Sequence, residues 1–166
     1  MNYALALTLL RILFVPVVIL LMYVSDLWSA VFFALASVTD WLDGYVARKF
    51  EQGTELGKFL DPLADKILVL SVLIVLAVQL RVEVFSVLLL VIREFAVMGL
   101  RCAVLEKGGA VVAASTMAKW KTAAQMTALF LLLIGWPLAK EIYYVSFLLA
   151  LASGAEYFWA HRNSLK

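Results

Sequence analysis

The chain has 166 residues, of which 65% are hydrophobic and 16% are charged, and its mean hydropathy is +0.99. A soluble domain of this length is nearer to about half apolar and about a quarter charged, so the composition indicates a protein that folds within a lipid bilayer. The net charge of +2 is too small to indicate a nucleic-acid-binding protein. Cys102 is the only cysteine, which excludes an internal disulfide bond.

Six long apolar segments follow one another along the chain, and a membrane-spanning helix needs about 20 residues. They cover Leu5–Val24, Leu27–Lys49, Leu60–Leu80, Val84–Leu105, Ser115–Ile134 and Ile142–Trp159. The opening MNYALALTLLRILFVP has no basic start and no small-residue cleavage site, so it predicts a retained first helix and not a signal peptide. We therefore expect an all-α integral membrane protein with six transmembrane helices, folded as a single domain over residues 1–166.

Lysine and arginine are unequally distributed between the two sets of segment ends. Nine lie at one set of ends, namely Arg48, Lys49, Lys58, Arg101, Lys107, Lys119, Lys121, Arg162 and Lys166, whereas the other set has only Arg81 and Lys140. Because positively charged loops tend to stay in the cytoplasm, this bias predicts that both termini and the charged loops are cytoplasmic. An even number of spans agrees with that orientation.

Two pairs of aspartates interrupt the apolar pattern on either side of the second loop. Asp40 and Asp43 are about 60° apart on a helix, and Asp61 and Asp65, expected to open the third segment, are about 40° apart. Helices joined by a short loop are expected to be antiparallel neighbours, so both pairs should lie at a similar depth. Converging carboxylates repel one another unless hard divalent cations such as Mg²⁺ or Mn²⁺ bind them. The alternative is four helix-end aspartates in ordinary caps and ion pairs.

The complete pattern is Asp40-x2-Asp43-Gly44-x2-Ala47-Arg48-x8-Gly57-x3-Asp61-x3-Asp65, with eight fixed residues over 26 positions. At every fixed position it resembles the signature of the CDP-alcohol phosphotransferases. Six spans with a cytoplasmic site also fit that family.

The resemblance implies two metal ions, Mg²⁺ or Mn²⁺, that clamp the pyrophosphate of a CDP-linked lipid. It assigns Asp40, Asp43 and Asp61 as principal metal ligands, and Asp65 as a further residue at the metals that serves as general base. The acceptor hydroxyl, deprotonated by Asp65, would attack the phosphorus on the lipid side, and CMP would leave.

The same resemblance places Gly44 and Arg48 in contact with the CDP moiety, with Thr54 in the loop as a further candidate. A planar guanidinium such as that of Arg48 can form two parallel hydrogen bonds to a phosphate, which a lysine ammonium cannot.

Four cations in the second half of the chain predict a pocket for a phosphate-bearing acceptor: Arg93, Arg101, Lys119 and Lys121. An arginine at bilayer depth is costly unless it faces a polar cavity. The two lysines stand in the first turns of the expected fifth helix, where cations are unfavourable unless an anion binds beside them. The alternative is that these cations are membrane anchors and snorkelling side chains, with Glu94 as a partner for Arg93.

The segments IREFAVMGLR, AKWKTAAQM and ALTLLRILFVP look like those of the bacterial phosphatidylglycerophosphate synthases. That resemblance implies transfer of a phosphatidyl group from CDP-diacylglycerol to sn-glycerol 3-phosphate. It also implies a homodimer among membrane lipids of the bacterial cytoplasmic (inner) membrane, with its active site facing the cytoplasm. Transfer to inositol phosphate or another small alcohol is the runner-up. A divalent-cation transporter would also carry acids in its helices, but often in repeated halves that are not evident here.

Two further features carry less specific predictions. Arg11, in LTLLRIL, either helps to hold the lipid phosphates or anchors the first helix. Aromatic residues near the expected span ends predict an interfacial belt made of Trp28, Trp136, Tyr143, Tyr144 and Trp159.

Overall fold

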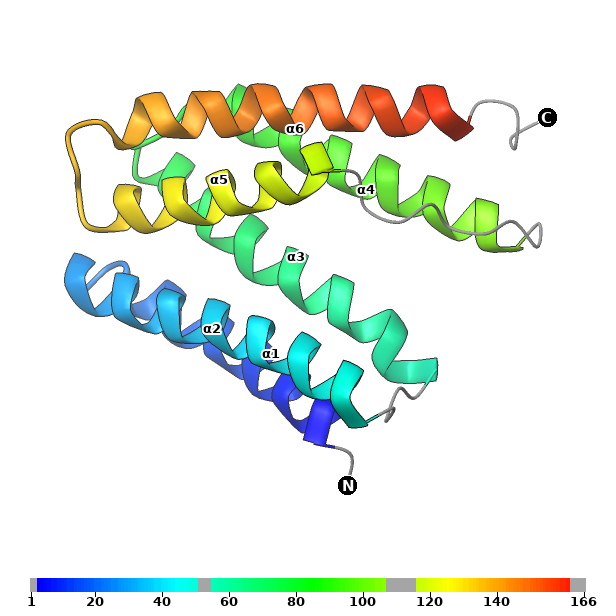
Figure 1. Ribbon diagram of the computed structural model, residues 1–166. Helices are drawn as coiled ribbons and strands as arrows, with labels where there is room; N and C mark the ends of the chain where they lie inside the picture. The colour runs from blue at the N-terminus through cyan, green and yellow to red at the C-terminus, as the bar shows by residue number, and fades with distance from the viewer. Residues whose placement is uncertain (1–2, 51–54, 107–115, 162–166) are drawn as a thin grey trace.

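The computed structural model describes the backbone of residues 3–50, 55–106 and 116–161, and within these ranges it holds six α-helices and no strand (Figure 1). The side chains described are those of residues 10–39, 66–104, 117 and 120–160. The helices are α1 (Tyr3–Leu21), α2 (Asp26–Phe50), α3 (Glu55–Val78), α4 (Val84–Glu106), α5 (Thr116–Leu133) and α6 (Ala139–His161). The six predicted helices are therefore confirmed. Over this described part of the chain, none of the helices combines the length and the apolar character of a membrane span.

The start of α3 differs most from the sequence-based expectation. The helix begins at Glu55, five residues before the expected Leu60, so Asp61 and Asp65 lie in its second and third turns and not at its opening. The polar, glycine-containing EQGTELG had indicated a loop up to Gly57. An acidic residue is favourable in a first helical turn, and one helical glycine costs only roughly 0.5–1 kcal/mol. The helix therefore extends further into this segment than the composition indicates.

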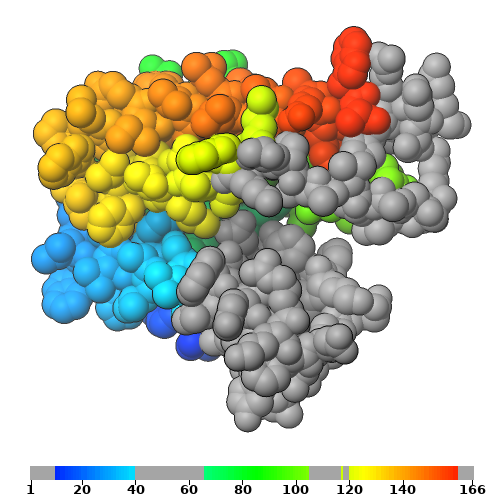
Figure 2. Space-filling view, viewed as in Figure 1, coloured from blue at the N-terminus to red at the C-terminus, as the bar shows by residue number. Residues whose placement is uncertain are grey.

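The helices pack as two groups that share α3. In the first group α1 packs against both α2 and α3, and in the second α6 packs against α4 and α5. Contacts of α3 with α4 and α5, and of α2 with α5, join the groups. Figure 2 shows α6, α5 and the first half of α2 as successive bands on one face. Fully buried apolar side chains between the helices form the core, including Phe33, Leu73, Leu76 and Leu129.

Successive helices alternate in direction, which gives the bundle two chemically different ends (Figure 1). One end holds the last turns of α2, α4 and α6 and the first turns of α3 and α5, and we call it the aspartate end. The other holds the α1–α2, α3–α4 and α5–α6 connections, and we call it the Arg81 end. The segment ends that carry most of the basic residues therefore lie together.

At the Arg81 end, one arginine and one aspartate form a hydrogen-bonded network whose charges balance. Arg81 Nη2 donates to both carboxylate oxygens of Asp26, at 2.7 and 2.6 Å, and its Nη1 donates to the carbonyl oxygens of Leu132 and Leu133. The last carbonyls of a helix have no partner within that helix. One guanidinium therefore caps α5 and ties it to the start of α2.

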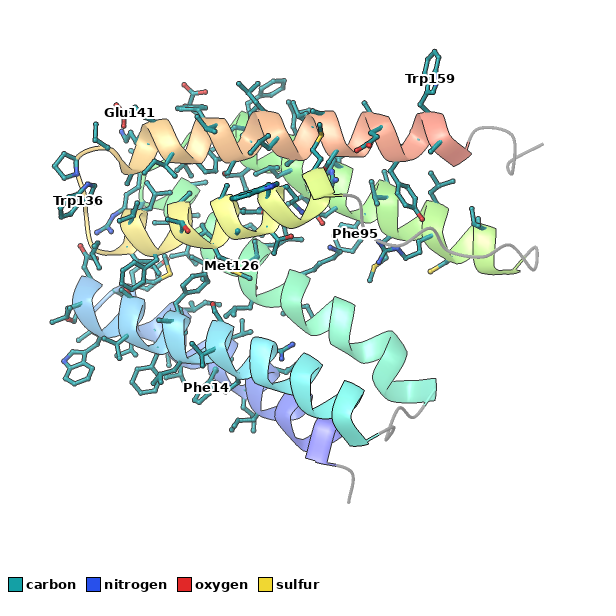
Figure 3. The ribbon with its side chains drawn as sticks, in the orientation of Figure 1. Phe14, Phe95, Met126, Trp136, Glu141 and Trp159 are labelled. Carbon is teal, nitrogen blue, oxygen red and sulfur yellow. The ribbon has the colours of Figure 1, made fainter. Side chains whose placement is uncertain are left out.

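The aromatic residues of the predicted belt differ in exposure. Trp28, Trp136 and Trp159 are more than half exposed, and Figure 3 shows Trp136 and Trp159 pointing away from the helices. The prediction is wrong for Tyr143, which is buried and lies 2.7 Å from Ser86, hydroxyl to hydroxyl. Its position near a helix end had indicated an interface, but its side chain turns inward, where the Ser86 hydroxyl satisfies its polar atom.

Candidate active site at the aspartate end

The helices place both aspartate pairs at one end of the bundle. Asp40 and Asp43 lie in the second half of α2, and Asp61 and Asp65 lie in the first three turns of α3. The two helices run in opposite directions, and their linked ends lie close together in Figure 1. Carboxylates are oxygen donors of the kind that Mg²⁺ and Mn²⁺ prefer, so the residue types fit the predicted metals.

Much of the predicted metal and nucleotide site lies outside the described side chains. The side chains of the four aspartates are not described. For Arg48 and Gly44, only the position on α2 is described. Thr54 falls in the segment 51–54, where the backbone is not described either. Among the side chains that are described, no group of three or more histidine, cysteine, aspartate or glutamate residues gathers in a metal-binding arrangement.

The best-defined polar cluster surrounds a single buried carboxylate, that of Glu94 on α4. Lys66 Nζ, from α3, donates to Glu94 Oε2 at 2.6 Å. Arg93 Nη1 donates to Glu94 Oε1 at 2.5 Å, and Lys121 Nζ, from α5, donates to the same oxygen. The Glu94 side chain is only 4% exposed. We call these four residues the Glu94 cluster, and it joins three helices through charge-assisted hydrogen bonds.

The Glu94 cluster has more positive than negative charge. Lys66, Arg93 and Lys121 bring three positive charges against the one negative charge of Glu94, which leaves a formal net charge of +2. Burial makes an uncompensated charge costly. A phosphate monoester carries a charge of about −1.5 to −2 at neutral pH, so it would match this excess.

Arg93 is fixed between α4 and α6. Besides its bond to Glu94, its Nη2 donates to Ser153 Oγ on α6 at 2.6 Å. A side chain at Gly154 would displace Arg93, because a Cβ at this glycine would lie 2.8 Å from Arg93 Nε. Arg93 Nε itself is buried and has no hydrogen-bond partner in the described part of the chain. The side chain is therefore inserted between two helices and does not snorkel to the surface, and Glu94 is its partner.

The other predicted acceptor residues lie nearer the ends of α4 and α5. Arg101 is two turns beyond Arg93, with its guanidinium carbon 5.8 Å from the centroid of the Tyr157 ring on α6. Arg101 Nε is buried and makes no hydrogen bond to any described side chain or backbone group. Lys119 lies in the first turn of α5, and its side chain is outside the described set. The structure thus brings Arg93 and Lys121 together and places Arg101 about 12 Å further along α4.

A small cavity of about 40 Å³ adjoins the Glu94 cluster between α3, α4 and α5. Its polar lining comes from Lys66, Glu94, Lys121, Thr122 and Gln125. The Met126 side chain, labelled in Figure 3, also lines it, and the hydroxyl of Ser37 on α2 contacts the Met126 sulfur. This volume exceeds the roughly 10–15 Å³ that a water molecule needs, so polar atoms of a ligand fit within it.

Sequence reasoning missed Lys66 and Gln125 as members of this site. Lys66 directly follows Asp65 in the chain, and Gln125 is four residues after Lys121, hence on the same face of a helix. Both positions could be read from the sequence, but Lys66 reaches the site only because α3 packs against α4 and α5. Arg11 on α1, which was left between two roles, is fully buried and so does not reach the surface as an anchoring side chain would.

Comparison with known proteins assigns the family. Residues 1–155 match the family model described as CDP-alcohol phosphatidyltransferase. Similar proteins include the CDP-diacylglycerol–glycerol-3-phosphate 3-phosphatidyltransferases of Bacillus subtilis (43% identical, covering 86% of this chain and 78% of that protein) and Rickettsia bellii (40%, covering 96% and 93%). The enzyme of the same name from Pseudomonas fluorescens is 39% identical, covering 100% of this chain and 89% of that protein. The chain belongs to the CDP-alcohol phosphatidyltransferase family, which confirms the prediction made from the aspartate pattern.

Proposed function

We propose that this protein transfers the phosphatidyl group of CDP-diacylglycerol to sn-glycerol 3-phosphate, forming phosphatidylglycerophosphate and CMP. The observation that carries the choice of acceptor is the Glu94 cluster, whose net charge of +2 suits a phosphate-bearing alcohol and not a neutral one. The similar proteins of Bacillus subtilis and Rickettsia bellii, named for this reaction, support the same substrates.

The proposed metal site consists of Asp40, Asp43 and Asp61, with Asp65 beside them, and would hold two Mg²⁺ or Mn²⁺ ions. Bound there, the ions would stabilise negative charge on the bridging and leaving oxygens of the pyrophosphate. Asp65 takes the proton from the acceptor hydroxyl. The hydroxyl oxygen then forms a bond to the lipid-side phosphorus, and the bond from that phosphorus to the bridging oxygen breaks. CMP leaves with that electron pair.

The proposed CDP-lipid site uses the last turns of α2. Gly44 leaves room for the nucleotide against the helix, because it has no side chain. Arg48 lies one turn further along α2 and binds a phosphate of the CDP moiety with its planar guanidinium. Thr54, in the following loop, is proposed as an additional contact.

The proposed acceptor site draws its positive charge from α4 and α5. Lys121 and Arg93 share the Glu94 carboxylate and bring their charge to the inner end of the site. Arg101 and Lys119, closer to the ends of their helices, would guide and hold the acceptor phosphate from the outer side. With the lipid-side phosphorus held at the metals, the acceptor hydroxyl would lie between the aspartates and the cations of the acceptor site.

A membrane setting belongs to the proposal. We expect the six helices to cross the bacterial cytoplasmic membrane, with the aspartate end in the cytoplasm, and the protein to act as a homodimer among membrane lipids. The 65% hydrophobic composition supports this, as does the gathering of basic helix ends at the aspartate end (Figure 1). Large apolar side chains that face outward, including Leu20, Leu88 and Leu148, supply the surface that acyl chains would contact.

An acceptor panel tests the proposal. Purified protein with Mg²⁺ and labelled CDP-diacylglycerol is offered sn-glycerol 3-phosphate, inositol phosphate or glycerol, and the lipid product and CMP are measured. We expect phosphatidylglycerophosphate from glycerol 3-phosphate and little product from glycerol. Preferential use of inositol phosphate would replace the proposed acceptor, and metal-dependent transport without CMP release would overturn the enzymatic function.

A further inference from the structure

The cavity beside the Glu94 cluster contains a hydrogen-bond donor without a partner among the described residues. Gln125 on α5 is 5% exposed, and its Nε2 is buried and makes no hydrogen bond to the residues that the structure describes. Most buried amide groups are paired, since leaving one unpaired forfeits its hydration without any return. Gln125 therefore indicates that an acceptor atom other than those of the described side chains belongs in this cavity.

Glu94 does not provide that acceptor atom. Its carboxylate already accepts hydrogen bonds from Lys66, Arg93 and Lys121. Each lysine ammonium has three donors and only one is used on Glu94, so Lys66 and Lys121 retain donors for another group. The polar lining of the cavity is thus dominated by donors, and an anionic oxygen fits it better than a second donor would.

Lys66 connects this cavity to the predicted catalytic base. It is the residue after Asp65 on α3, and it reaches across to Glu94 on α4 while remaining 23% exposed. A phosphate that Lys66 binds would therefore lie within a short distance of the turn of α3 that carries Asp65. In sn-glycerol 3-phosphate the reacting hydroxyl is joined to its phosphate through a three-carbon chain, which suits such a spacing.

On the basis of the proposed transfer reaction, we propose that Lys66 and Gln125 bind the phosphate of the acceptor, and that Glu94 is a positioning residue that holds Lys66 beside Lys121. The cavity receives one or two phosphate oxygens and not the whole acceptor. Gln125 donates from α5, Lys66 donates from α3, and Glu94 keeps the two helices in register without touching the substrate.

The test is steady-state kinetics with both substrates varied, in Lys66→Met and Gln125→Met. Each change keeps a similar side-chain volume and removes the donor. We expect the KM for glycerol 3-phosphate to rise roughly 10- to 150-fold in Lys66→Met and roughly 10-fold in Gln125→Met, the range for hydrogen bonds to charged groups. The KM for CDP-diacylglycerol should change much less. Lys66→Arg, which keeps the charge, should recover most of the affinity.

Matched controls come from the Arg81 end. Gln79→Met removes an amide that donates to the Met22 carbonyl, and Lys140→Met removes an exposed lysine at the start of α6. Both should retain the parental KM for glycerol 3-phosphate. If Lys66 or Gln125 had a purely structural role, its substitution would lower the stability of the protein without raising the KM for glycerol 3-phosphate.

A second readout does not depend on turnover. Inorganic phosphate that binds the folded protein should raise its melting temperature, and this shift should shrink in Lys66→Met and Gln125→Met but not in the two controls. Parental KM values together with a parental phosphate shift in both variants would overturn the inference, as expected if only a water molecule fills the cavity. If the parental protein itself releases no CMP with glycerol 3-phosphate, the proposed function fails instead.

Discussion

Each end of the bundle has an arginine bonded to a carboxylate, but the two pairs differ in burial and in charge balance. At the Arg81 end, Arg81 and Asp26 are 30% and 46% exposed, and one positive charge meets one negative charge. At the aspartate end, the Glu94 carboxylate is 4% exposed and holds three cations. Exposed pairs contribute only about 0–1 kcal/mol. The comparison suggests that the Arg81–Asp26 pair mainly connects helices, whereas the Glu94 cluster has excess positive charge that can bind an anionic ligand.

Metal removal should have the largest effect at the aspartate end. Excess chelator should abolish turnover, Mg²⁺ or Mn²⁺ should restore it, and Ca²⁺ should restore little because it accepts looser coordination. Asp40→Asn, Asp43→Asn and Asp61→Asn should each weaken metal binding and reduce CMP release severely. Asp26→Asn, at the other end, is the matched control. Full turnover in chelator would exclude metal-dependent transfer.

The base assignment is tested separately. Asp65→Asn removes the proton acceptor and should lower kcat strongly, with a smaller effect on the binding of CDP-diacylglycerol. A lipid-binding assay measures the affinity for CDP-diacylglycerol, and single-turnover CMP release measures the rate of the chemical step. Near-parental kcat in Asp65→Asn would assign the base to another residue.

Breaking each pair should separate their contributions to stability. Glu94→Gln leaves buried cations without their counter-charge and should lower the free energy of unfolding by about 3–5 kcal/mol. Asp26→Asn should lower it by less than about 1 kcal/mol, since Asp26 is exposed and Arg81 is only half-buried. Reversible unfolding in mixed micelles measures both. Equal losses in the two variants would contradict the distinction between the ends.

Removing a cation should affect acceptor use only at the aspartate end. Alanine at Arg93, Arg101, Lys119 or Lys121 should reduce kcat/KM for glycerol 3-phosphate by roughly 10- to 150-fold, about 1.5–3 kcal/mol per charged hydrogen bond. Arg81→Ala serves as the control and should keep the parental value. The stability of Arg93→Ala is measured first, since Arg93 also binds Ser153. Parental kinetics in all four variants would remove the acceptor pocket.

The sequence predicts the helices and the aspartate pattern well, because both depend on local spacing. Apolar runs of spanning length gave all six helices, and the 26-residue pattern gave the family. It also predicted that the four acceptor cations form a pocket, and it named Glu94 as a partner for Arg93 alone. The bonds of Lys66 and Lys121 to Glu94 and the cavity at Gln125 arise from packing between α3, α4 and α5, which no local pattern encodes. The prediction that Tyr143 lies in an interfacial belt was wrong for the same reason, since the burial of a side chain depends on the neighbouring helix.

The smallest expected effect concerns the helix ends at the Arg81 end. α3 and α5 both finish with paired hydrogen bonds to carbonyls three and five residues back, through Leu80–Arg81 and Gly135–Trp136. The residue at the bend has positive φ in each, 71° at Gly135 but 59° at Leu80, whose side chain is 83% exposed. Such a conformation costs a residue with a Cβ about 1–2 kcal/mol.

Leu80→Gly should therefore raise the free energy of unfolding by about 0.5–1 kcal/mol, since glycine's greater freedom in the unfolded chain offsets part of the relief. Gly135→Ala is the converse change and should lower it by about 1 kcal/mol, although the site has open space for a Cβ. Both variants should keep the parental kcat/KM, because the bends lie at the end of the bundle away from the aspartates. Denaturant unfolding of the two variants beside the parental chain measures the difference, and a loss of stability in Leu80→Gly would show that the leucine side chain contributes more than its backbone strain costs.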